Sequence, residues 1–170
     1  MKRLTYMTFM VMNCLFMNAQ KKYEISSTGC SVNMYCQPGF LSDVDQDANP
    51  VYTARCTKDD INYGIYCIVL KTPISNLRAA EDEMVGYIEY MKADFEITSV
   101  KGYEKGFKLN NREDTRGLVD YWKDSKSNNW KLKAYTDGKI IGILYAFSRK
   151  ELPEEKVNSY FDSFRLPGME

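Results

Sequence analysis

Four oxygen-bearing side chains alternate along one polar segment of the sequence. Asp43, Asp45, Asp47 and Asn49 occupy alternate positions of Asp-Val-Asp-Gln-Asp-Ala-Asn. Calcium loops collect hard oxygen ligands with this spacing. Two features of such a loop are missing, because alanine stands at the sixth position, where the turn favours glycine, and at the twelfth, where a bidentate glutamate belongs. These four residues are the one candidate metal site, for calcium, and a solvated acidic loop is the alternative.

Carboxylates are the other groups that could do chemistry, because the chain contains no histidine. That absence excludes Ser-His-Asp and Cys-His catalytic sets and histidine-ligated zinc. Asp114, Asp120 and Asp124 share one parity along a predicted strand, and Glu113 is adjacent. General acid–base catalysis needs a carboxyl whose pKa burial has raised, and no pattern here predicts such burial. We interpret these carboxylates as surface charges and predict no catalytic residues, no bound cofactor and no enzymatic activity.

Aromatic residues are frequent in the predicted strands, and most of them should pack in the core. Tyr121 and Trp122 are neighbours in one strand, so their side chains must point to opposite faces. One of the two is therefore a candidate exposed aromatic residue. Exposed aromatic side chains on a sheet can stack on sugar rings or contact a protein partner.

The first 19 residues have the pattern of a secretory signal peptide. Lys2 and Arg3 precede an apolar stretch that ends at Met17, and the small residue Ala19 precedes the expected cleavage point. The apolar stretch is about 14 residues long, shorter than the roughly 20 that cross a bilayer as a helix. We therefore expect residues 20–170 to form one exported domain, periplasmic or extracellular, without a membrane span.

The signal-like segment and the net charge also limit which anchors and partners we expect. Cys14 lacks the preceding small residue of a lipoprotein signal, so we do not expect a lipid anchor there. Without Lys2 and Arg3, the 23 basic residues fall to 21 against 23 acidic ones, which is a net charge of −2. Nucleic-acid-binding domains carry a basic excess, so we expect no nucleic-acid partner.

Four cysteines remain beyond the leader, and an even number in an exported domain predicts two disulfides. Cys56 and Cys67 bracket a predicted hairpin turn, whereas Cys36 and Cys56 flank the acidic loop and compete for the same bridge. Cys30 and Cys36 cannot bond if both lie in one extended strand. The alternatives that stay open are Cys30–Cys67 with Cys36–Cys56, or the two local loops.

Hydrophobic patterning predicts an α+β fold, a mainly antiparallel β-sheet of about 6–8 strands. A long helix (about 75–95, capped by Ser75) and a C-terminal helix (about 153–164) should pack on this sheet. Residues 37–50 read as a polar connection, and residues 140–147 are apolar on both faces, as in a central strand. The other strands are expected at 23–27, 31–35, 51–57, 63–71, 97–103, 114–123 and 130–136.

The C-terminal quarter resembles the PsbP-like superfamily, the extrinsic photosystem II proteins and their bacterial relatives. The resemblance rests on the run from Trp130 to Phe147, on Leu152-Pro153 and on Tyr160-Phe161-Asp162-Ser163-Phe164-Arg165-Leu166. It covers about 40 residues well, and the remainder only by the order of elements. It implies an α/β/α sandwich around an antiparallel sheet, and a binding or assembly role more than catalysis.

Together these features predict an exported, non-catalytic module that binds a protein partner or assists assembly in the cell envelope. The alternative is a domain that binds a small ligand, either a glycan through exposed aromatic residues or calcium through residues 43–49.

Overall fold

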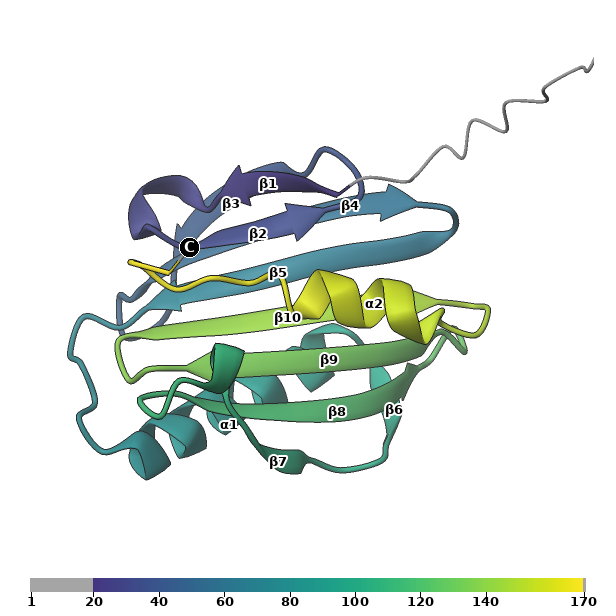
Figure 1. Ribbon diagram of the computed structural model, residues 1–170. Coiled ribbons are helices and arrows are strands. Elements are labelled where there is room, and N and C mark those ends of the chain that lie inside the picture. The colour runs from purple at the N-terminus through teal and green to yellow at the C-terminus, as the bar shows by residue number, and fades with distance from the viewer. Residues whose placement is uncertain (1–19, 170) are drawn as a thin grey trace, which may run out of the picture.

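An eight-stranded antiparallel sheet runs through the centre of the molecule (Figure 1). The computed structural model describes residues 20–169, so the predicted signal peptide lies outside the described residues. The strand order is β3-β4-β5-β10-β9-β8-β6, and β7 also pairs with β8. The strands are β3 (Gly39–Val44), β4 (Pro50–Lys58), β5 (Ile61–Val69), β6 (Ile97–Val100), β7 (Glu104–Phe107), β8 (Arg116–Asp124), β9 (Asn129–Thr136) and β10 (Ile140–Ser148).

A different layer covers each face of this sheet. Helix α1 (Leu77–Asp94) packs on one face, and helix α2 (Glu154–Phe161) packs on the other beside a hairpin of β1 (Lys21–Glu24) and β2 (Ser31–Met34). Two short 3-10 turns, η1 (Ser26–Thr28) and η2 (Leu109–Asn111), complete the elements. The predicted α+β class is confirmed, with helices on both faces. The PsbP-like resemblance stays a prediction.

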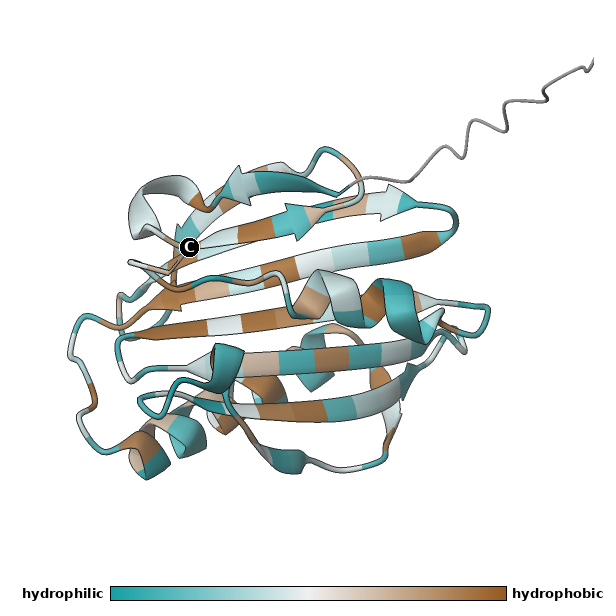
Figure 2. Cartoon of the chain, in the orientation of Figure 1, coloured by the Kyte–Doolittle hydropathy of each residue, from teal (hydrophilic) through white to brown (hydrophobic). Residues whose placement is uncertain are grey.

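Strand β10 lies at the centre and is apolar on both sides (Figure 2). Ile141 and Ile143 belong to the core under α1, whereas Ile140 and Leu144 belong to the core under α2. Successive side chains of a strand alternate between faces, so a strand with both faces covered must be apolar throughout. The prediction of a central strand at residues 140–147 is confirmed.

Four predicted boundaries were wrong. The strand expected at 23–27 ends at Glu24, and the turn η1 follows it. Residues 37–50 contain β3, an edge strand whose residues are all exposed and which therefore lacks the alternation that marks a half-buried strand. The strand expected at 97–103 is divided into β6 and β7 near Gly102, whose φ of 101° suits glycine. Asn76, not Ser75, caps α1, because its side chain accepts hydrogen bonds from the amides of the first helical turn.

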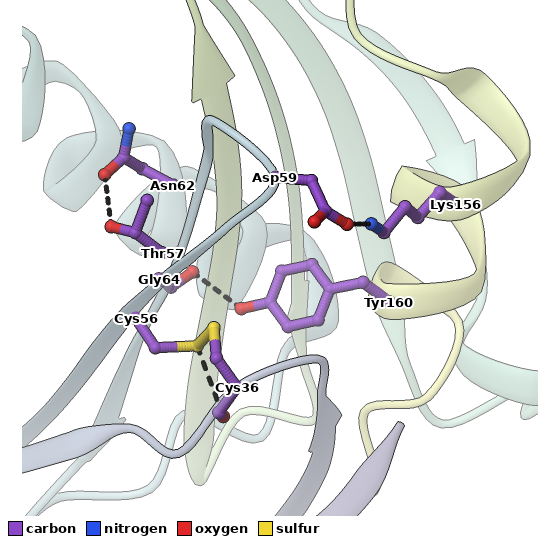
Figure 3. The surroundings of a disulfide bond; sticks show 8 residues. All are labelled: Cys36, Cys56, Thr57, Asp59, Asn62, Gly64, Lys156 and Tyr160. Carbon is purple, nitrogen blue, oxygen red and sulfur yellow. Dashed lines mark hydrogen bonds and ion pairs between the residues drawn. A yellow bond between two sulfur atoms is a disulfide. The ribbon is translucent and has the colours of Figure 1, made fainter. Parts of the chain in front are cut away.

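One disulfide joins Cys36, just after β2, to Cys56 in β4 (Figure 3). Cys30 and Cys67 are both buried and free, and interaction between the two thiols lowers the pKa of Cys30 and raises that of Cys67. Cys56 cannot reach Cys67, because the β4–β5 register places Tyr63 opposite Cys56 and Tyr52 opposite Cys67. The Cys36–Cys56 pairing is therefore confirmed, the local pairing was wrong, and Cys30–Cys67 is a thiol contact rather than a bond.

Removing the disulfide should destabilise the fold, because it fastens the hairpin layer to the sheet across a sequence separation of 20 residues. Closing a loop of this length lowers the entropy of the unfolded chain, which stabilises the folded state by about 3 kcal/mol. The variant Cys36→Ser/Cys56→Ser should lose that much unfolding free energy in urea titrations. A reductant should destabilise the parent protein and leave this variant unchanged; equal stability of the two proteins would contradict the prediction.

Gly64 should not tolerate even a methyl group. A Cβ atom at this position in β5 would lie 2.2 Å from Cζ of Tyr145, a fully buried ring in β10. We expect Gly64→Ala to cost about 1–3 kcal/mol of unfolding free energy. The matched control is Gly86→Ala in α1, whose Cβ would meet no described atom within 4 Å and should stabilise the helix by about 0.5–1 kcal/mol.

Candidate functional site

Helix α1 covers only part of its face of the sheet, and an open groove lies beside it. The helix packs over β8, β9 and β6 and its side chains reach Ile68 of β5, which leaves β3 and β4 without a helix on this face. The groove between α1 and these strands has a volume of about 780 Å³. That is the size of ordinary ligand pockets, so it is the candidate binding site.

The floor of the groove comes from the strands and its wall from the helix. Leu41 of β3 pairs with Thr53 of β4, and Asp43 pairs with Val51, so these side chains lie on the groove side of the sheet. Residues of β5 and β10 continue the floor, namely Tyr66, Ile68 and Ile143. The wall is formed by Gly86, Tyr87, Tyr90 and Met91.

The rim of the groove exposes large apolar side chains. Leu41 is 73% exposed, Tyr90 64% and Val44 61%, and all three line the groove. Single exposed apolar residues are common, but several around one concave surface mark an interaction site. This is where exposed apolar area gathers beside a groove in the described part of the chain.

The groove is also acidic, although the full chain has equal numbers of acidic and basic residues. Five carboxylates line it and no lysine or arginine does; they are Asp43, Asp45, Asp47, Glu83 and Asp94. Within residues 20–169, none of these acids takes part in an ion pair. The nearby Arg55 faces the aromatic residues instead, with its guanidinium 5.4 Å from the ring centroid of Phe95 and a 3.3 Å hydrogen bond to Tyr66 Oη. The groove therefore presents uncompensated negative charge.

Asp45 closes one end of the groove by joining the β3–β4 turn to α1. Tyr87 Oη donates a hydrogen bond to the Asp45 carboxylate, and Asn49 Nδ2 donates another at 3.0 Å. The amides of Asp47 and Asn49 donate to its other oxygen at 2.9 and 2.8 Å. Burial alone would raise the pKa of Asp45, but these hydrogen bonds outweigh it and hold the pKa below its ordinary value.

The same hydrogen bonds bear on the predicted calcium site. Asp45 is engaged by Tyr87 and backbone amides, and Asp43 Oδ1 accepts from the Val44 amide at 2.8 Å. Asn49 is buried and its Oδ1 accepts from the Lys71 amide. No group of three or more histidine, cysteine or acidic side chains among residues 20–169 could surround a metal ion. The structure thus uses these residues to shape a turn and gives the calcium prediction no support.

Tyr121 and Trp122, the candidate exposed aromatic residues, lie outside the groove. Trp122 is buried beneath α1, so Tyr121 alone of the pair is left as a candidate exposed residue. Tyr121 points to the opposite face and is half-buried, with Lys101 and Lys131 Nζ atoms at 5.0 and 5.3 Å from its ring centroid. The prediction that the two side chains point to opposite faces is confirmed. Helix α1 covers Trp122, and the side chains of Lys101 and Lys131 lie over the ring of Tyr121.

The interpretation of the β8 carboxylates as surface charges was wrong for two of them. Asp120 and Asp124 are buried on the α1 face, where each accepts a hydrogen bond from a tryptophan indole. Trp122 Nε1 donates to Asp120 at 2.6 Å, and Trp130 Nε1 donates to Asp124 at 2.9 Å. Burial would raise the pKa of Asp124, but hydrogen bonds from Asn128 and Trp130 lower it instead. Both carboxylates are therefore structural acceptors, whereas Asp114 and Glu113 remain exposed.

Sequence reasoning missed the groove, although two signals for it exist. Phe40 and Leu41 are adjacent apolar residues inside a segment that otherwise reads as a polar connection. Tyr90 lies outside the apolar stripe of α1, so it had no predicted place in the core. No protein-family model and no curated protein matches the chain, so the site is interpreted from its geometry.

Tyr87→Phe should destabilise the protein, because it removes a hydrogen bond to a charged acceptor that fastens the turn to α1. We expect a loss of about 1–2 kcal/mol in unfolding free energy at neutral pH, given the partial exposure of the pair. Tyr90→Phe, four-fifths of a helical turn away with an exposed hydroxyl, is the control and should leave stability unchanged.

The unfolding free energy lost in Tyr87→Phe should also depend on pH. The folded-state pKa of Asp45 is lowered, so its stabilisation is present above the unfolded pKa of about 3.9 and is lost as the pH falls through the folded value. Urea titrations at several pH values should therefore show that the unfolding free energies of the parent and of Tyr87→Phe converge below about pH 4. A difference that stays constant down to pH 2 would show that Tyr87 acts by packing alone.

Proposed function

We propose that the protein is an exported, non-catalytic binding module that holds a protein partner in the groove between α1 and β3. The observation that carries the proposal is the coincidence of an open concave surface with exposed Leu41, Val44 and Tyr90. Apolar and aromatic side chains at the centre of a desolvated surface supply most of the energy of protein association.

Export is supported by the signal-like pattern of residues 1–19 and by the Cys36–Cys56 disulfide, a bond that persists in oxidising compartments. No helix among residues 20–169 is long and apolar enough to span a membrane. The PsbP-like resemblance also favours a binding or assembly role, and we propose the cell envelope as the place where the protein acts.

A small ligand is the second candidate, and the size of the groove favours it. A volume of about 780 Å³ with Tyr66, Tyr87 and Tyr90 in its lining would also accommodate a glycan or another small molecule. The rim is the reason to prefer a protein, because exposed Leu41 and Val44 lie along a strand edge and extend the apolar surface beyond the concavity.

The proposal is tested by quantitative affinity capture with matched variants. Tagged parent protein, Leu41→Asp and Val100→Asp are each captured from the native cell envelope, and co-purifying proteins are quantified by mass spectrometry. Val100 is the control because it is an exposed apolar strand residue on β6, far along the sheet from β3.

A partner that depends on the groove should be retained at equal stoichiometry by the parent and Val100→Asp. It should fall about tenfold or more with Leu41→Asp, since a buried charge costs at least the corresponding 1.4 kcal/mol. If every co-purifying protein responds equally to both variants, or none is stoichiometric, the groove is not a protein-binding site.

A further inference from the structure

We infer that the partner enters the groove as an extended segment that carries both apolar and basic residues on one face, and that this segment pairs with the open edge of β3 as an additional strand. This inference rests on the proposed function and specifies the chemistry of the partner. It draws on the hydrogen-bonding pattern of β3, on the side chains along that strand and on the charge of the groove.

The backbone of β3 has an unpaired edge. β3 is the last strand of the sheet, and β4 lies on its other side. The Asp45 amide donates to the carbonyl of Asn49 at 3.0 Å, which closes the β3–β4 hairpin. Because antiparallel ladders alternate, Asp43 and Leu41 also direct their amides toward β4, whereas Phe40, Ser42 and Val44 direct theirs outward.

The outward amides are blocked only at one end. The Val44 amide is covered by the Asp43 carboxylate at 2.8 Å, which is a local way of shielding an edge. Phe40 and Ser42 have exposed side chains and no such cover from the described residues. An incoming strand would lie about 4.8 Å from β3 and could exchange hydrogen bonds with both of these residues.

The side chains define what such a strand should carry. Leu41 and Asp43 face the groove, so two positions of the added strand that lie two residues apart would place one apolar and one basic residue on that side. The unpaired carboxylates of Asp47, Glu83 and Asp94 around the groove favour further positive charge. A cationic segment would therefore find apolar contacts, backbone partners and complementary charge in one place.

A second copy of this chain does not meet these requirements. The β3 sequence Gly-Phe-Leu-Ser-Asp-Val contains no basic residue and brings an additional carboxylate. Pairing two β3 edges would therefore leave the negative charge of both grooves without compensation. The chemistry favours a different protein over self-association.

The inference is tested with a synthetic, fluorescein-labelled ten-residue peptide in which two valines and two lysines follow one another in turn (Val-Val-Lys-Lys-Val-Val-Lys-Lys-Val-Val), so that each face carries both residue types. A second peptide carries glutamate in place of lysine. Binding to the purified protein is measured by fluorescence anisotropy at low and high salt. Ser42→Pro removes one outward amide at an edge position where proline is tolerated, and Ser42→Ala is the matched control that retains it. Urea titration first confirms that both variants are folded.

We expect the lysine–valine peptide to bind the parent and Ser42→Ala, to weaken with salt, and to bind Ser42→Pro about tenfold less tightly. Hydrogen exchange at the Phe40 and Ser42 amides should slow when this peptide is bound. Equal binding of the glutamate peptide, equal binding to Ser42→Pro, or no binding at all would overturn the inference. So would protection of these amides in a peptide-free dimer.

This outcome is separable from that of the proposed function. Partner capture that depends on Leu41, together with peptide binding that is indifferent to Ser42→Pro, would retain the groove as a protein site and remove strand addition. Loss of both effects would remove both proposals.

Discussion

The structure depends on a central strand that is apolar on both faces. β10 pairs with β5 on one side and β9 on the other, so its isoleucine and leucine side chains must be buried above and below the sheet. Neither face can then be left to solvent, because exposing such a strand would forfeit roughly 2 kcal/mol for each large aliphatic side chain. Two separate layers are the consequence.

The two layers are offset from each other, and the groove follows from that offset. α1 packs toward β8, β9 and β6, whereas α2 and the β1–β2 hairpin lie over the opposite face nearer β4, β5 and β10. The α1 face of β3 and β4 is therefore open. The disulfide and the Asp45–Tyr87 hydrogen bond secure the borders of this open region, one behind the sheet and one at the end of the groove.

Some acidic side chains stabilise the core, whereas others line the groove and are accessible to a partner. Asp120 and Asp124 are buried and accept hydrogen bonds from Trp122 and Trp130, so their charge is satisfied within the core. The acids of the groove make no ion pairs in the described chain, although Asp45 accepts hydrogen bonds from the turn and from Tyr87. They lie beside an exposed apolar rim. Exposed apolar side chains gathered around one concave surface are unusual where a surface contacts only solvent, and this is the physical reason for the proposed binding role of the groove.

The sequence by itself determined the elements whose patterns are local. Turn chemistry at Asp137-Gly138, the apolar spacing of α1 and the two-faced apolar run of β10 predicted the sheet, the helices and the α+β class. Cysteine counting narrowed the pairing to alternatives that included Cys36–Cys56. Local patterns carry this information because alternation and helical spacing are set by backbone geometry.

Only the tertiary structure decided what was buried and what was open. Asp120 looked like a surface charge and Trp122 like a candidate exposed ring, because the sequence does not specify which strands α1 covers. β3 was missed because an edge strand without a covering layer has no alternation. The hydrogen bond of Asp45 in the acidic loop was missed because its donor, Tyr87, comes from a distant helix. The groove exists through that placement of α1, which arises from long-range packing and not from any one segment.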